Sequence, residues 1–327
     1  MLYVTGGRQR ASAERQEEWH RFAGALILGC ESDGGGVRSL VDYQSPPEVC
    51  PDNQPSVVFK AGSRCGDELH VCTQTEVLRY RLPDFRRLGH LSLPFFNDLH
   101  HVTPTPWGTL LVAVTGLDVV AELSRDGVLL RCWDVLGDEP WRRFSRDVDY
   151  RRVATTKPHL SHPNAVFTIA EDIWVTRFEQ RDAICLTRPR LRIDIAIERP
   201  HDGCVFDGLV YFTTVDGHVV KADPQRGEVL AVWPLAALIG CTAPLGWCRG
   251  LKVVSEDQVV VGFSRLRWTR FSENVAWAKS RLRSALRVAS HVRPQPTRIV
   301  ALDLRRGEVL WQANLEDQGM HAVFSIL

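Results

Sequence analysis

The stretch WGTLLVAVTGLDVVAELSRDGVLLRCWDV, from Trp107 to Val135, decides the fold. It contains three short runs rich in β-branched and other apolar residues, and each run is separated from the next by a turn that contains glycine and aspartate. Runs of this length between such turns are typical of antiparallel strands. The stretch therefore predicts three consecutive strands of one small sheet.

The same pattern recurs along the chain. It is found again in GDELHVCTQTEVLRYRLPD and RRLGHLSL (66–93), in DGLVYFTTVDGHVVKADPQRGEVLAVWPL (207–235), and in EDQVVVGF, RIVALDLRRG and EVLWQANL (256–315). A sheet of this size cannot bury both of its faces alone, and radial stacking of repeated sheets hides most of their edges. The repetition therefore predicts an all-β fold, a β-propeller.

A further segment precedes most of these units, and we assign it to the innermost strand of each blade. These segments are PSVVFKAG from Pro55, HHVTPTPWG from His100, HPNAVFTIAED from His162, HDGCVFDG from His201, CRGLKVVSED from Cys248, and HAVFSIL from His321 to Leu327. The last completes the blade begun by GALILGCE (24–31) and VRSLVDYQ (37–44). We expect six blades, with the ring closed by pairing of N- and C-terminal strands.

The domain organisation follows from this assignment. Residues 1–23 are predicted to be an N-terminal extension that is partly helical, and residues 24–327 a single propeller domain. The polar segment 136–161 is expected to be a long loop at the mouth of the propeller. An insert, 266–296, interrupts the last blade, and its stretch FSENVAWAKSRLRSALRVAS predicts a basic amphipathic helix. Its basic residues favour a solvated face, with a lid or an anionic-partner surface as the alternative.

The composition excludes several classes of protein. Lys and Arg number 40 against 39 Asp and Glu, so the net charge of +1 predicts no nucleic-acid partner and no anionic lipid surface. No apolar run reaches the length of a signal peptide or a membrane helix, which predicts a cytoplasmic protein without a membrane partner. The nine cysteines include no Cys-x-x-Cys pair, so structural zinc and dithiol motifs are not expected.

Candidate functional residues gather at the starts of the inner strands. All inner strands of a propeller run in one direction, so their first residues meet at one end of the central channel. This predicts a ring of histidines and one arginine, in which adjacent residues of a strand point to opposite sides, so that only one of the first pair faces inward. Its members are His100 or His101, His162 with His159 nearby, His201, Arg249 and His321. The PSVVF segment supplies no histidine, which predicts an opening toward Pro55.

Converging imidazoles are typical of transition-metal sites, and we expect Fe, Cu or Zn. The candidate metal ligands are His100, His101, His162, His201 and His321. His201 and Arg249 are the candidate catalytic residues. Arg249, Asp98, Asp202 and His159 are candidate substrate-binding residues, with a turn-forming role as the alternative for both aspartates.

Several of these motifs resemble those of known propellers. The order NDLHHV, TGLDVVAELSRDG, HPNAV, HDG, WCRGL and VVVGFSRLR, between Asn97 and Leu327, resembles an uncharacterised family of bacterial six-bladed propeller proteins. A more distant similarity is to the arylsulfate sulfotransferases, and it implies a histidine nucleophile among His100, His162, His201 and His321, with Arg249 as anion clamp. The carotenoid oxygenases are similar in architecture alone, with iron held by four histidines.

These observations lead to one principal hypothesis and two alternatives. The principal hypothesis is a metal-dependent enzyme, an oxidoreductase or lyase, that acts on a small organic or peptide substrate. The first alternative is a metal-free, sulfotransferase-like group transferase that uses histidine and arginine. The second is a propeller without catalytic activity that binds a peptide or protein across its mouth.

Overall fold

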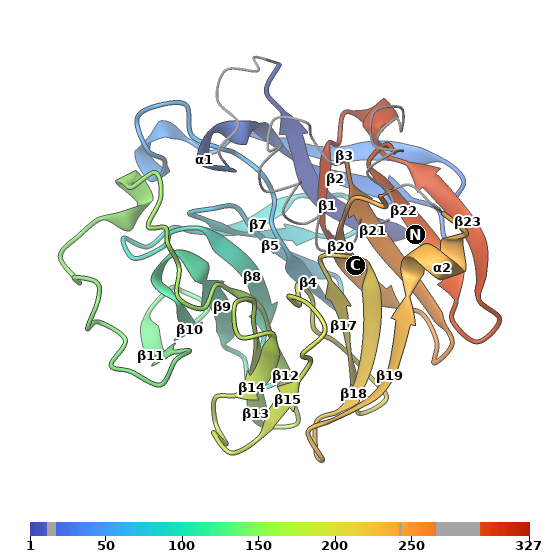
Figure 1. The fold of residues 1–327 in the computed structure, drawn as a ribbon. Helices are drawn as coiled ribbons and strands as arrows, with labels where there is room; N and C mark the ends of the chain where they lie inside the picture. Colours follow the sequence, from blue (N-terminus) through green and yellow to red (C-terminus); the bar gives the residue numbers. More distant parts are fainter. Residues whose placement is uncertain (12–17, 242–243, 266–294) are drawn as a thin grey trace, which may run out of the picture.

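The fold is a six-bladed β-propeller, as predicted from the repeats. The computed structural model describes residues 1–11, 18–241, 244–265 and 295–327. These residues form six sheets of four antiparallel strands each. Figure 1 shows the sheets following one another around a ring, so that the sequence colours run from blue to red and meet where the ring closes.

Five of the blades take their four strands in chain order, from the innermost strand outward. The second blade contains β4 (Gly62–Cys65), β5 (Glu68–Cys72), β6 (Val77–Arg81) and β7 (Arg87–Leu91), and the third contains β8 (Leu99–Pro104), β9 (Leu110–Val114), β10 (Val119–Leu123) and β11 (Leu129–Asp134). The fourth contains β12 (Pro163–Ile169), β13 (Asp172–Arg177), β14 (Asp182–Cys185) and β15 (Arg192–Asp194). The fifth contains β16 (Cys204–Phe206), β17 (Leu209–Thr214), β18 (His218–Asp223) and β19 (Glu228–Pro234), and the sixth contains β20 (Trp247–Val253), β21 (Gln258–Ser264), β22 (Arg298–Asp303) and β23 (Glu308–Asn314).

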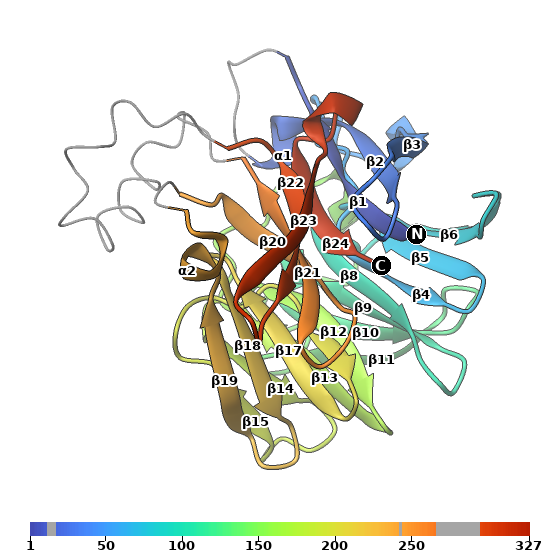
Figure 2. The same ribbon diagram turned by 90° about the vertical axis from the view of Figure 1, so that its right-hand side faces the viewer.

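The first blade closes the ring, as expected, and its strand order is β24-β1-β2-β3. The innermost strand, β24 (Ala322–Ile326), pairs with β1 (Leu2–Gln9), followed by β2 (Phe22–Cys30) and β3 (Val37–Tyr43). Figure 2 shows β24 beside β1 and the two chain ends next to each other. The amide of Tyr3 donates to the carbonyl of Leu327 at 2.9 Å, so the closure extends to the final residue.

The first residues of the chain correct one prediction. Residues 1–23 were expected to be an extension, but residues 2–9 form a full strand of the first blade, and among the described residues of this range Glu18–Arg21 is helical (α1). The strand was not predicted because the pair Gly6-Gly7 interrupts its run of apolar residues. A side chain cannot fit at Gly6, because a Cβ there would lie 1.9 Å from the carbonyl oxygen of Ala322. Glycine thus permits the close approach of β1 and β24.

The core lies between neighbouring blades. Every residue of β9 and β10 is buried, because sheets cover both faces of these middle strands. The outermost strand β19 instead alternates exposed and partly buried residues along its length. Middle strands therefore have nearly continuous apolar sequences, whereas outer strands keep the alternation of a half-exposed strand.

Two connections depart from the regular pattern. The loop 136–161 carries the chain from the third blade to the fourth and contains a short 3₁₀ turn, Tyr150–Arg152. The amide side chain of Asn97 holds this loop, since its Nδ2 donates to the carbonyls of Tyr150 at 2.8 Å and Val153 at 2.7 Å. A short helix, α2 (Leu235–Ile239), follows β19. The helix predicted within the insert 266–296 lies outside the described residues.

A search of the described helices for a long apolar segment of membrane-spanning length finds none.

Candidate metal centre

The inner strands bring histidines from three successive blades together at the propeller axis. His100 begins the third blade in β8, while His162 and His201 precede β12 and β16. The ring centroids of His100 and His162 are 4.7 Å apart, and those of His100 and His201 are 6.3 Å apart. Phe324 of β24 continues the set, with its ring 6.2 Å from that of His201. Residues dispersed over more than 200 positions of sequence thus line one channel.

A candidate metal centre adjoins this channel. One ligand atom from each of Asp98, His159 and His162 lies within 4.8 Å of the other two, and all three side chains are partly buried. The Nδ1 atoms of His159 and His162 are 2.8 Å apart. Two neutral imidazoles and one carboxylate form a donor set that binds iron or zinc in many metalloproteins.

The hydrogen bonds of His159 determine which of its nitrogens is available. The hydroxyl of Thr156 donates to the backbone carbonyl oxygen of Gly116, so that its oxygen accepts from Nε2 of His159 at 3.3 Å. Nε2 therefore carries the proton, and the lone pair of the neutral ring is on Nδ1, which faces His162. A partner that fixes the far nitrogen of a histidine is typical of metal ligands.

His162 is held in place by its backbone. Its φ of 59° is in the left-handed region, which a non-glycine residue adopts only when the surroundings impose it. Asp118 imposes it: Oδ1 accepts from the amides of His162 at 2.7 Å and Ser161 at 3.1 Å, and Oδ2 accepts from the amide of Leu160 at 2.8 Å. Asp118 is fully buried and was not among the residues predicted from the sequence.

Asp118 also remains ionised despite its burial. Burial alone raises the pKa of its carboxyl group, but hydrogen bonds from the amide of His162, the guanidinium of Arg143 and the amides of Leu160 and Ser161 together hold that pKa below its ordinary value. The Arg143 contact is 2.8 Å long. The long loop 136–161 is therefore anchored to the blades by one buried carboxylate.

His100 and His101 have different surroundings, as the strand alternation predicted. His100 has Nδ1 2.9 Å from the carbonyl oxygen of Asp98, which places the proton on Nδ1 and the lone pair on Nε2. His101 points between blades instead. Its Nδ1 accepts from the backbone amide of Val166 at 3.2 Å, and its Nε2 donates to the carbonyl oxygen of Gly62 at 3.1 Å. Both nitrogens of His101 are thus engaged by backbone, away from the candidate centre.

His321 also differs from the predicted arrangement. Its Nδ1 accepts a hydrogen bond of 3.2 Å from the backbone amide of Gln9, at the end of β1. The ring contacts that join His100, His162 and His201 do not include it. His321 therefore takes part in the closure of the first blade.

A lysine that was not predicted as a site residue lies in the channel, in the segment before the second blade. Lys60 belongs to the PSVVFKAG segment, and its side chain is fully buried. Its Nζ lies 3.3 Å from Oδ1 of Asp98 and 4.7 Å from the ring centroid of Phe324. The side chain of Lys60 therefore lies where the sequence predicted an opening toward Pro55. The available signal was a single lysine in the apolar segment PSVVFKAG, which was wrongly predicted to be the innermost strand of its blade: it precedes β4, which begins at Gly62.

His201 is buried beside Asp202, the last of the predicted site aspartates. Its Nδ1 is 3.6 Å from Oδ1 of Asp202, and neither ring nitrogen has a hydrogen-bond partner among the described residues. Oδ2 of Asp202 accepts from the Thr213 hydroxyl and, at 3.0 Å, from the amide of Gly250, so Asp202 joins the fifth and sixth blades. Burial lowers the pKa of His201, and the charge of Arg249 contributes to this, so the ring is neutral near pH 7.

Arg249 of β20 completes the channel from the sixth blade. Its guanidinium carbon lies 4.9 Å from the ring centroid of Phe324 and 5.5 Å from that of Trp247. The guanidinium thus contacts Trp247 and also lies against Phe324, whose ring neighbours that of His201.

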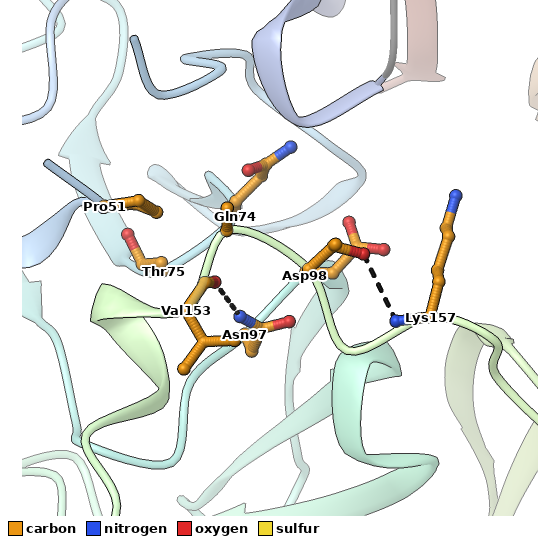
Figure 3. Close-up of a pocket in the computed structure, with 9 residues that line it drawn as sticks. Pro51, Gln74, Thr75, Asn97, Asp98, Val153 and Lys157 are labelled. Carbon is orange, nitrogen blue, oxygen red and sulfur yellow. Dashed lines mark hydrogen bonds between the residues drawn. The ribbon is translucent and has the colours of Figure 1, made fainter. Parts of the chain in front are cut away.

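A shallow surface pocket adjoins the candidate centre. Figure 3 shows its walls, with Asp98 and Lys157 on one side and Pro51 and Thr75 on the other. The long loop supplies Val153, Ala154, Thr155 and Lys157 to this lining. Asp98 belongs both to the pocket and to the candidate metal centre. The predicted mouth loop thus forms one wall of the pocket.

Comparisons with known proteins define the fold but no family. No family model matches the chain, and no curated protein matches it. A protein of unknown function from Bacteroides caccae aligns over 99% of this chain and 97% of its own, with a TM-score of 0.61 and 13% identity. The similarity to the arylsulfate sulfotransferases is not supported by these comparisons.

Two further solved structures share the architecture. A chain of a nidogen/laminin complex aligns over 100% of this chain and 97% of its own, with a TM-score of 0.54 and 8% identity. The WD40 β-propeller domain of Doa1 aligns over 92% of this chain and 78% of its own, with a TM-score of 0.50 and 10% identity. At these identities the likeness concerns the fold alone.

Proposed function

We propose that this protein is a metal-dependent enzyme whose metal is bound by Asp98, His159 and His162, and that it acts on a small organic or peptide substrate. The observation that carries the proposal is the proximity of three ligand atoms within 4.8 Å of one another at the mouth of the propeller. An oxidoreductase or lyase reaction suits such a centre.

The donor set fits a transition metal. Thr156 leaves the lone pair of His159 on the nitrogen that faces His162, and the Nδ1 atoms at 2.8 Å are close enough to bind one ion after slight separation. Two imidazoles and one carboxylate leave coordination positions open, so bound iron or zinc would act as a Lewis acid, and iron or copper would also permit redox chemistry.

The neighbouring residues have separate roles in this proposal. His100, whose ring lies 4.7 Å from that of His162, would border the bound substrate. Lys60 partly neutralises Asp98 and keeps its carboxylate in position. The shallow pocket beside the long loop gives access to Asp98 from the surface.

Metal content tests the proposal directly. We expect protein purified without a polyhistidine tag, or soaked afterwards in Fe(II), Zn(II) or Cu(II), to retain about one equivalent of one of these metals by elemental analysis. The His159→Ala and Asp98→Asn variants should lose at least about tenfold in metal affinity, because each removes one of three ligands. His101→Gln is the control and should retain the metal, because both ring nitrogens of His101 bind backbone. Absence of any metal after soaking would refute the proposal.

A further inference from the structure

The inner channel beyond the metal cluster is lined by groups that can bind an anion. Three of them surround Phe324: Nζ of Lys60 at 4.7 Å, the guanidinium carbon of Arg249 at 4.9 Å and the ring centroid of His201 at 6.2 Å, each measured to the centroid of the phenyl ring. They lie in or just before the second, sixth and fifth blades. Two cationic side chains and one imidazole from distant parts of the chain therefore lie around the same phenyl ring.

His201 gives independent support for a ligand at this place. The residue is 3% exposed, and neither of its ring nitrogens has a hydrogen-bond partner in the described part of the chain. Buried polar atoms are nearly always paired, so an unpaired buried nitrogen calls for an explanation, of which a bound ligand is one. Because Asp202 lies on the Nδ1 side, at 3.6 Å, the Nε2 side is the one open to a ligand.

The charges of the channel favour an anion when the metal is bound. Lys60 and Arg249 are offset by Asp98 and Asp202, and both carboxylates already have partners. Asp98 is shared between Lys60 and the metal cluster, and Asp202 accepts from Thr213 and Gly250. A divalent metal adds two positive charges that no further acid in this set offsets. A bound oxyanion would offset this excess positive charge.

We propose that Lys60, His201 and Arg249 form a subsite for an oxyanion, a carboxylate, sulfate or phosphate group carried by the substrate. The inference rests on the proposed metal-dependent function and specifies its substrate class: a small organic anion whose charged group lies against Phe324 while its reacting part is held near Asp98 and His162. Arg249 supplies planar paired donors and Lys60 supplies a point charge, while His201 presents its Nε2 edge to the same place.

Sulfate is the probe for the test, because it is fully ionised at neutral pH and leaves the metals in solution. Binding is measured by calorimetry at constant ionic strength, with chloride replaced by sulfate, on metal-free and metal-loaded full-length protein. We expect the wild-type protein to bind sulfate, and to bind it more tightly when loaded with metal. Arg249→Gln should weaken sulfate binding at least about tenfold through loss of charged hydrogen bonds.

The control variant is Arg226→Gln, which removes an exposed arginine of a β18–β19 turn and should bind sulfate as the wild type does. Arg249→Lys keeps the charge and should weaken binding by a smaller factor, so it carries the test if circular dichroism shows that Arg249→Gln does not fold. Equal sulfate affinity in the wild type and in every folded Arg249 variant would overturn the subsite, as would a wild type that does not bind sulfate.

Metal content is measured on the same samples, so the two proposals fail separately. Protein that binds sulfate through Arg249 but takes up no metal would retain the subsite and refute the metal-dependent function. Protein that holds metal but binds no sulfate would refute the subsite and leave the metal centre standing.

Discussion

His100 and His101 are neighbours in sequence with opposite surroundings. One lies at the channel, with its ring 4.7 Å from that of His162, and the other is buried between blades with both nitrogens on backbone. His101 therefore contributes to the packing of the blades through its neutral ring. Burial lowers the pKa of His101 below its ordinary value, so the folded protein disfavours its protonation.

The sign of the resulting pH dependence follows from that shift. The unfolded chain protonates His101 near its ordinary pKa of about 6.5, whereas the folded chain does so only at lower pH. The stability that neutral His101 provides is fully present above about pH 6.5 and declines as the pH falls toward the lower pKa of the folded state. Burial lowers the pKa of His70 to about 4, which acts in the same direction.

We therefore predict that the free energy of unfolding falls between pH 7 and pH 5, and that His101→Gln reduces this slope. Each buried histidine contributes up to about 1.4 kcal/mol per pH unit, and glutamine retains a donor and an acceptor without titrating. Urea denaturation in the presence of a chelator measures the slope without a contribution from metal binding. An identical slope in the variant would contradict the assignment.

The site residues differ in how far the sequence could predict them. His100, His162, His201 and Arg249 could be predicted because each lies at or near the start of an inner strand, a position defined by the repeat. The pairing of Asp98 with His159 and His162 could not be, because it depends on irregular backbone. Both Asp98, with φ of 47°, and His162, with φ of 59°, adopt the left-handed conformation, which no periodic pattern indicates.

Asp118 fixes the end of the loop 136–161 to the third blade. This aspartate lies between two strands of the third blade, in the turn after β9, and accepts hydrogen bonds from the amides of residues 160–162. It thereby connects a rigid sheet to the segment that carries His159 and His162. Asp118 is a positioning residue for the proposed metal centre, since it acts through the backbone of the ligand residues.

Asp118→Asn tests this role. The substitution places an NH₂ group where one carboxylate oxygen accepts from donors, and we expect it to lower the free energy of unfolding by about 1–3 kcal/mol. We also expect metal affinity to fall at least about tenfold, because the histidines lose their fixed separation. Calorimetric metal titration of the folded variant measures the second effect.

The same loop provides the matched control. Asp138→Asn removes an exposed carboxylate that pairs with Arg142 at 3.0 Å and should change neither quantity appreciably. Equal metal affinity in Asp118→Asn and Asp138→Asn would show that the hydrogen bonds of Asp118 do not position the metal ligands.

At the scale of the whole molecule, β24 holds the ring closed. Val323, Phe324 and Ile326 are all buried, and full burial of each side chain contributes about 1.5–3 kcal/mol. Their sum approaches the total stability of an ordinary domain. The blade count and this closure could be predicted from the repeats, whereas β1 could not, because its two glycines break the apolar pattern.

We predict that deletion of residues 321–327 abolishes the cooperative unfolding transition, as followed by circular dichroism and thermal denaturation. A circular permutant provides the control. It joins Leu327 to Met1 by a short linker, which the pairing of Tyr3 with Leu327 permits, and opens the exposed turn between Gln225 and Arg226. This permutant should fold, since it retains β24, and a stable deletion variant would contradict the closure.

The closing strand also sets an order of events during synthesis. β24 leaves the ribosome after every other strand that the structure describes, yet its Phe324 lies against both Lys60 and Arg249. A nascent chain can therefore complete five blades while the inner edge of β1 is still unpaired and the channel still lacks a wall. Assembly of the channel therefore has to wait for β24, and a chain interrupted before this strand would present the open edge of β1 to chaperones and proteases.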